Sequence, residues 1–135
     1  MKHITLEQLQ ERAAGTGAFL DATALSGSWV NTNSSPSLIR HIQLEPGQNQ
    51  LIMRAVGAEP GLPDDWGVAE AQPFAEDAAS GLASAFSASF DLGGIECLLQ
   101  GYLVKGVLVV VSFTGVKDGR ERSSSFGKEF FYRAP

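Results

Sequence analysis

Eight short segments of this 135-residue chain alternate between apolar and polar residues, and turn-forming residues separate each from the next. Successive side chains of a strand point to opposite faces, so a period of two predicts half-buried β-strands. Turn sequences such as Pro46-Gly47 and Lys117-Asp118-Gly119-Arg120 keep several connections short, which indicates hairpins between consecutive strands. The predicted strands are residues 27–33, 37–45, 50–57, 66–72, 82–91, 95–104, 107–116 and 121–133.

We therefore predict an all-β fold, a single antiparallel up-and-down eight-stranded β-barrel with a short N-terminal α-helix. The helix is expected to begin at Thr5, with Gln8 completing a capping box, and to end at Gly15. The resulting domain division is a helix and linker over residues 1–24 and a barrel over residues 25–135.

The net charge of −5 opposes binding to a phosphate backbone, so no nucleic-acid partner is expected. Lys117, Arg120 and Arg122 lie close together, but Asp118 and Glu121 lie between them, which predicts a solvated hairpin tip.

The single cysteine, Cys97, excludes an intrachain disulfide, and its apolar surroundings predict an inert buried thiol. Residues 1–12 contain no apolar core of a signal peptide, and the longest apolar stretch, residues 106–113, is too short for a membrane-spanning helix. We therefore expect a cytoplasmic protein with no membrane partner.

Two terminal motifs, Gly27-Ser28-Trp29 and Phe131-Tyr132-Arg133, resemble the calycin superfamily, which contains the lipocalins, fatty-acid-binding proteins and avidins. The resemblance implies that Trp29 plugs the closed end of the barrel and that Arg133 packs across it. Physically this would be a cation–π cap on an apolar plug, worth about 1–2 kcal/mol where partly desolvated.

The first predicted strand is also similar to that of avidins, because Gly27-Ser28-Trp29-Val30-Asn31 matches their Gly-x-Trp-x-Asn. The avidin likeness implies that Asn31 points into the barrel and hydrogen-bonds a ligand. Avidins enclose biotin with several later tryptophans, whereas this chain has only Trp66 besides Trp29, so we do not expect biotin binding. The stretch from Ile39 to Gly67 also resembles a set of small bacterial barrel proteins of unassigned role.

Several residues are candidates for lining a ligand site inside the barrel. Arg40 and Arg54 would need a carboxylate or a bound anion if they faced inward, and the alternative is that each faces solvent. Small residues at positions that can face inward would leave room; these are Ala85, Ser87, Ser89, Gly101 and Ser112. The candidate ligand-binding residues are Asn31, Arg40, Arg54, Trp66, Tyr102 and Ser112.

The function that these features predict is the binding of a small, mostly apolar molecule inside the barrel, without a cofactor. One alternative is an enzyme of specialised metabolism that uses Glu70 and Tyr102 as an acid/base pair for isomerase or cyclase chemistry. No metal site is expected, because His3 and His41 are the only histidines and His3 lies at the terminus.

A second alternative is a solid-cored protein-interaction module. The predicted strand from Val107 to Val116 is apolar on both faces through Val111, so its outward face must be covered. The N-terminal helix or a second subunit could cover it. We favour the second subunit and predict a homodimer through this strand.

Overall fold

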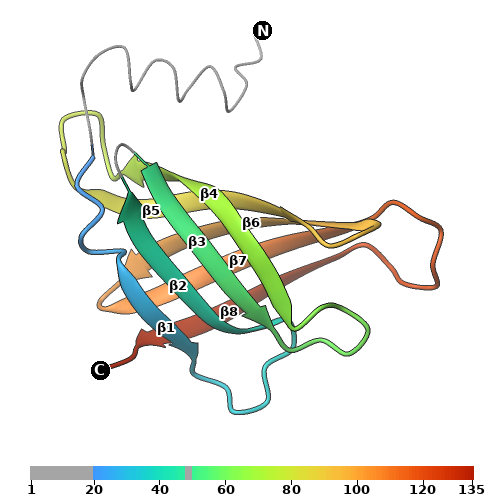
Figure 1. Cartoon of the computed structure of the whole chain (residues 1–135). Coiled ribbons are helices and arrows are strands. Elements are labelled where there is room, and N and C mark those ends of the chain that lie inside the picture. The colour runs from blue at the N-terminus through green and yellow to red at the C-terminus, as the bar shows by residue number, and fades with distance from the viewer. Residues whose placement is uncertain (1–19, 48–49) are drawn as a thin grey trace, which may run out of the picture.

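The computed structural model describes residues 20–47 and 50–135, and there it forms one closed barrel of eight antiparallel strands (Figure 1). The predicted fold class is therefore confirmed for the barrel, whereas the expected N-terminal helix lies outside the described residues. The strands are β1 (Gly27–Asn31), β2 (Ile39–Gly47), β3 (Gln50–Gly57), β4 (Asp65–Ala75), β5 (Ala83–Asp91), β6 (Ile95–Val104), β7 (Val107–Val116) and β8 (Ser125–Arg133).

Each strand pairs with the next one along the chain, and β1 pairs with β8, so the sheet has the up-and-down order predicted. The first and last strands meet where Trp29 lies opposite Arg133. In Figure 1, β1–β4 and β5–β8 run at an angle to each other, which gives the barrel a flattened shape.

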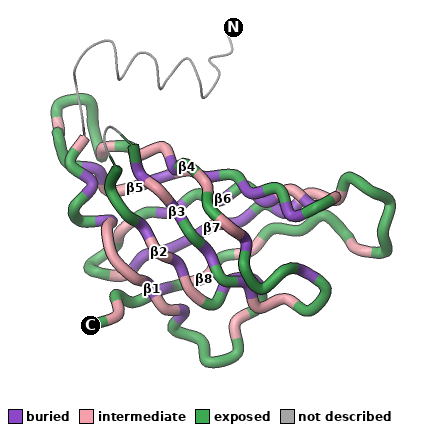
Figure 2. The backbone as a smooth tube through the Cα atoms, viewed as in Figure 1, coloured by how far each residue is buried: buried purple, intermediate pink, exposed green. Residues whose placement is uncertain are grey.

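The interior is built from the apolar face of every strand, and buried residues alternate with exposed ones along the chain in Figure 2. Trp29, Phe86 and Phe131 are the largest of the fully buried side chains. Gly101 faces the ring of Phe86 from the neighbouring strand, and a Cβ atom at this position would overlap that ring. A glycine is therefore required there for the aromatic side chain to fill the interior.

Two strands extend beyond the predicted boundaries. β2 continues through Pro46 and Gly47, and β4 continues past Pro73 to Ala75. Beyond Ala71, β4 pairs with β5 rather than with β3, so the N–H that Pro73 lacks costs no bond to β3. In contrast, β8 begins only at Ser125 rather than at residue 121.

The pairing between the two halves of the barrel is confined to one end. β4 pairs with β5 over residues 72–75 and 83–87, and β1 pairs with β8 over residues 29–31 and 131–133. Towards the other end, residues 65–71 of β4 pair with β3, and residues 125–130 of β8 pair with β7. The sheets β1–β4 and β5–β8 therefore separate at this second end. We call the first the Trp29 end and the second the Glu129 end.

Candidate functional site

The Trp29 end is closed by the chain segment that precedes β1. Leu25 is fully buried there, and its carbonyl oxygen accepts a 2.9 Å hydrogen bond from the indole N–H of Trp29. The guanidinium of Arg133 lies 4.4 Å from the centre of the Trp29 ring and donates hydrogen bonds to the carbonyl oxygens of Ala24 and Ser26. The cation thus stacks on the plug and ties the preceding segment across it.

The Glu129 end is held together by hydrogen bonds to one carboxylate. Glu129 lies on β8 and accepts bonds from the backbone N–H of Ile39 at 3.1 Å and of Leu38 at 3.5 Å. It also accepts a 2.8 Å bond from the side-chain amide of Asn31, whose second amide hydrogen goes to the Ile39 carbonyl at 2.8 Å. A single side chain therefore bridges the seam between β8 and the residues that link β1 to β2.

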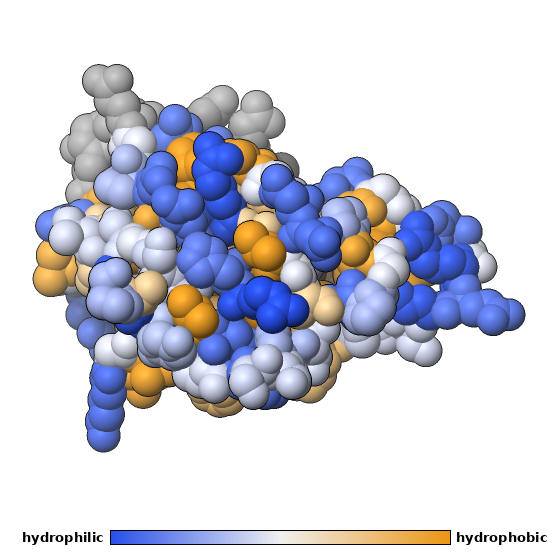
Figure 3. Space-filling model, turned by 60° about the horizontal axis from the view of Figure 1, so that its bottom comes forward, coloured by the Kyte–Doolittle hydropathy of each residue, from blue (hydrophilic) through white to orange (hydrophobic). Residues whose placement is uncertain are grey.

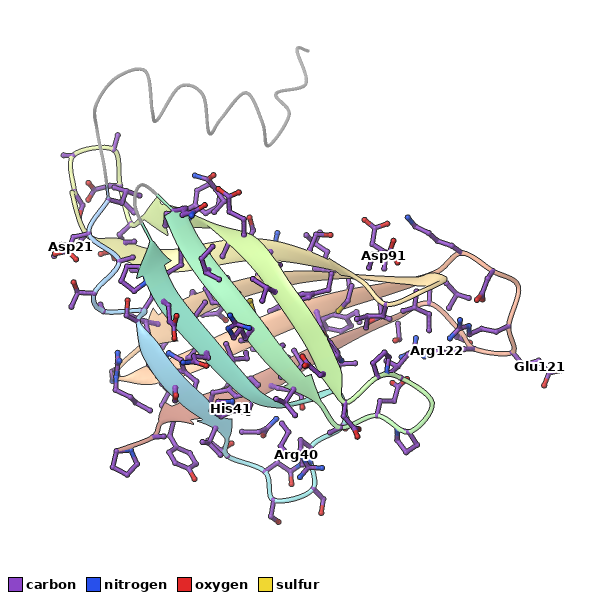
Figure 4. All side chains as sticks on the ribbon, in the orientation of Figure 1. Asp21, Arg40, His41, Asp91, Glu121 and Arg122 are labelled. Carbon is purple, nitrogen blue, oxygen red and sulfur yellow. The ribbon has the colours of Figure 1, made fainter. Side chains whose placement is uncertain are left out.

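An ion pair joins two loops at the same end. Arg122 and Glu59 form a bidentate contact, with hydrogen bonds of 2.9 and 2.6 Å, and their side chains are only 19% and 27% exposed. The hydrogen bond to Glu59 raises the pKa of the Arg122 guanidinium. Figure 4 shows Arg122 set back from the tip of its hairpin, where Glu121 points into solvent.

Trp66 packs on the second seam, where β4 and β5 separate. Its ring lies edge-on to Phe90 of β5, with centroids 5.5 Å apart, and Gly57 leaves room for the indole. Trp66 is 6% exposed, and within the described residues its indole N–H has no hydrogen-bond acceptor. A buried donor without a partner costs about 1–3 kcal/mol, which an acceptor on a bound molecule or water would recover.

Small or polar side chains line the interior of β6 and β7 near this end. Cys97, Ser112 and Thr114 are all buried, and the Cys97 sulfur lies 3.7 Å from the Thr114 hydroxyl. Burial raises the pKa of the Cys97 thiol, while its contact with Thr114 and the charge of Arg122 act in the opposite direction. The thiol is therefore protonated at neutral pH and is not a nucleophile.

Three of the six predicted ligand-binding residues line the interior. Asn31, Trp66 and Ser112 are buried, and both amide hydrogens of Asn31 are used within the protein. The other three do not lie there. Arg40 and Arg54 are exposed on the outer wall, and Tyr102 on β6 is also exposed.

The outward position of Arg40 has a local cause. A β-bulge between Ile39 and His41 shifts the register, so that Ile39 and Ile42 both face inward, and strict alternation from Ile42 assigns Arg40 to the wrong face. Figure 4 shows Arg40 at the lower edge of the barrel.

The proposed acid/base pair is not inside the barrel. Glu70 and Tyr102 both lie on the outer wall, and the other tyrosine of the chain, Tyr132, is exposed as well. An interior carboxylate acting with an interior tyrosine is therefore excluded, and the carboxylate that does reach the seam is Glu129.

The inward-facing side chains of β5 are larger than we expected from the sequence. Phe86 and Phe90 are buried, whereas Ala85, Ser87 and Ser89 lie on the outer side of the strand. Of the small residues expected to leave room, only Gly101 and Ser112 face the interior.

Sequence reasoning missed Glu129, Glu59 and Arg122 as parts of a site. Glu129 had a detectable signal, because it lies two residues before Phe131 and therefore shares its inward face. The ion pair had none, since its two residues are 63 positions apart in loops.

The outer surface holds a groove of about 310 Å³ between β2, β3 and the start of β4, and its lining includes His41, Arg54, Asp64 and Asp65 beside Ala55 and Val56. Residues 20–47 and 50–135 contain no group of three or more His, Cys, Asp or Glu side chains placed to hold a metal ion. On the face seen in Figure 3, hydrophobic side chains form separate small areas among hydrophilic ones. Within the described part of the chain, no helix is long and apolar enough to cross a membrane.

Comparison with models of known protein families, with curated proteins and with solved structures gives no match for this chain.

Proposed function

We propose that this protein is a calycin-like barrel that binds a small, mostly apolar molecule in the interior of the Glu129 end. The observation that carries the proposal is the difference in lining between the two ends. Trp29, Leu25 and Phe131 pack the Trp29 end with apolar groups, whereas the buried polar side chains of the described residues, Asn31, Ser112 and Thr114, lie towards the other end, among apolar ones such as Leu62 and Ile95.

Two further features support this position. The sheets β1–β4 and β5–β8 are not paired with each other at the Glu129 end, and side-chain contacts close the seams there, Trp66 with Phe90 on one and the hydrogen bonds of Glu129 on the other. The indole N–H of Trp66, which has no acceptor among the described residues, supplies one further donor in a mostly apolar wall, the usual composition of a small-ligand site.

The two tryptophans allow a direct test, because one lies at each end of the barrel. A brominated long-chain alcohol quenches tryptophan fluorescence only at contact range. We expect saturable quenching in Trp29→Phe, which retains Trp66, and little quenching in Trp66→Phe, which retains Trp29. Circular dichroism of both variants checks that the barrel is intact. Equal quenching of both tryptophans, or none, contradicts the proposal.

A variant with a larger side chain in the interior provides a second test of the proposed binding site. Ser112→Leu adds an apolar side chain to the interior, and Ser87→Leu adds the same group to the outer side of β5. We expect Ser112→Leu to lower the affinity for the brominated alcohol at least about tenfold, which corresponds to about 1.4 kcal/mol. Ser87→Leu is expected to bind as the unmodified protein does.

A further inference from the structure

We propose that the outer wall of β6–β8 binds a second copy of this chain, so that the protein is a homodimer. This inference is independent of the small-molecule site, since it concerns the opposite side of the same strands. The side chains that define this outer apolar face are Leu98, Tyr102, Phe113, Phe126, Phe130 and Tyr132.

These side chains form continuous rows across three paired strands. Phe113 on β7 lies opposite Leu98 on β6 and Phe126 on β8, and the two phenyl rings have centroids 6.0 Å apart. Nearer the Trp29 end, Val109 lies between Tyr102 and Phe130 and is only 4% exposed. Val109 is therefore closed off from water, whereas the two aromatic rings beside it remain open to water.

The exposed area is large enough for a stable interface. The six side chains are between 36% and 70% exposed, which amounts to roughly 550 Å² for groups of this size. This area lies towards the upper limit of about 300–600 Å² that the largest apolar patch on a typical monomer covers. A standard interface buries about 800 Å² on each partner, of which about 57–65% is apolar. The face by itself thus supplies the apolar share of one side of such an interface.

Charge favours a second copy over a charged partner. Lys128 lies between the rows, but its ammonium is 5.9 Å from the centre of the Phe130 ring in the same chain. The wall formed by β2 and β3 carries exposed Arg40, Glu45 and Arg54, and packing it on this face would remove those charges from water at a cost. A second copy brings one charge of its own into the contact, Lys128, rather than the three of that wall, so the cost is smaller, and a two-fold axis brings two such faces together.

A groove and an exposed ring lie at opposite ends of the face. A groove of about 560 Å³ lies beside Leu98, Phe113 and Phe126 near the Glu129 end, whereas Tyr132 lies at the Trp29 end of β8. Antiparallel packing of two copies would bring the exposed ring of one copy towards the groove of the other.

The test is the mass of the full chain in solution, measured by sedimentation equilibrium from micromolar to millimolar concentration. We expect twice the 14.3 kDa of the chain. Phe126→Glu and Tyr132→Glu each place a charge in the proposed interface and should raise the dimer dissociation constant at least about tenfold. Both side chains are exposed, so the barrel should fold in each variant, which circular dichroism verifies.

Val68→Glu is the matched control, because Val68 is 52% exposed on the outer side of β4, away from this face. This variant should dimerise as the unmodified chain does. A mass of one chain over the whole concentration range overturns the proposal. So does a dimer that persists unchanged in both face variants, or one that Val68→Glu weakens as much as they do.

Discussion

The two ends of the barrel hold the same two sheets together by different means. At the Trp29 end, β1 and β4 pair directly with β8 and β5, and a cation stacks on a buried indole. At the Glu129 end, that pairing has stopped, and a carboxylate, an ion pair and an aromatic edge contact bridge the seams.

The two tryptophans show the same contrast. The indole N–H of Trp29 has its acceptor in the Leu25 carbonyl, whereas that of Trp66 has none in the described residues. Most buried polar groups in protein interiors have a hydrogen-bond partner, so a buried donor without one requires an explanation. Among the described residues, the buried indole N–H at the Trp29 end is therefore paired, and the one at the Glu129 end is not.

The largest effect should come from Glu129→Ala. Loss of the carboxylate leaves the N–H groups of Ile39 and Leu38 and the amide of Asn31 without their acceptor, which should lower the free energy of unfolding by about 3 kcal/mol. Urea denaturation measures this change. Glu70→Ala removes an exposed carboxylate on β4 and should change stability by less than about 0.5 kcal/mol. Similar effects in both variants would mean that packing alone closes the Glu129 end.

Arg133→Ala probes the other end. It removes the stacking on Trp29 and two hydrogen bonds to the preceding segment, and we expect a loss of about 1–2 kcal/mol in the free energy of unfolding. Affinity for the brominated alcohol should stay within about twofold, because the proposed site lies at the opposite end. Arg54→Ala, on the exposed outer wall, serves as the control. A large loss of affinity in Arg133→Ala would show that the two ends are coupled.

The tryptophans should differ in their tolerance of the same change. Trp29→Phe removes a paired N–H and leaves the Leu25 carbonyl unsatisfied, whereas Trp66→Phe removes an N–H that has no acceptor in the part of the chain that the structure describes. Both variants leave a similar cavity, so Trp29→Phe should cost about 1 kcal/mol more in thermal or urea unfolding. The opposite order would indicate that Trp66 makes a hydrogen bond in solution.

The smallest effect is expected for the ion pair of Arg122 and Glu59. Its side chains are largely covered, so a double-mutant cycle with Arg122→Ala and Glu59→Ala should give a coupling of about 1 kcal/mol that persists in high salt. Lys117 and Glu96 form an exposed pair at the same end and should show no measurable coupling under those conditions. Equal coupling in both pairs would show that burial does not distinguish them.

The number of strands, their order and most of their boundaries could be predicted from the sequence, because alternation and turn residues are local signals. The inward position of Trp29 and its place next to Arg133 at the junction of the first and last strands also had a sequence pattern behind them. Alternation alone did not decide which face of β5 points inward. Phe86 and Phe90 alternate with Ser87 and Ser89, so either set could have faced the interior. The β-bulge at Ile39 likewise places Arg40 on the outside, and no turn residue in the sequence indicates this bulge.

By itself, then, the sequence of this protein determined a closed antiparallel barrel, because the period of its side chains and the length of its turns act over a few residues. Only the tertiary structure decided what the Glu129 end is made of. Glu129 meets backbone groups some 90 positions away, and Arg122 meets Glu59 across 63. Contacts of that separation depend on strand twist, register and the point at which two sheets part, and none of these is encoded in a local pattern.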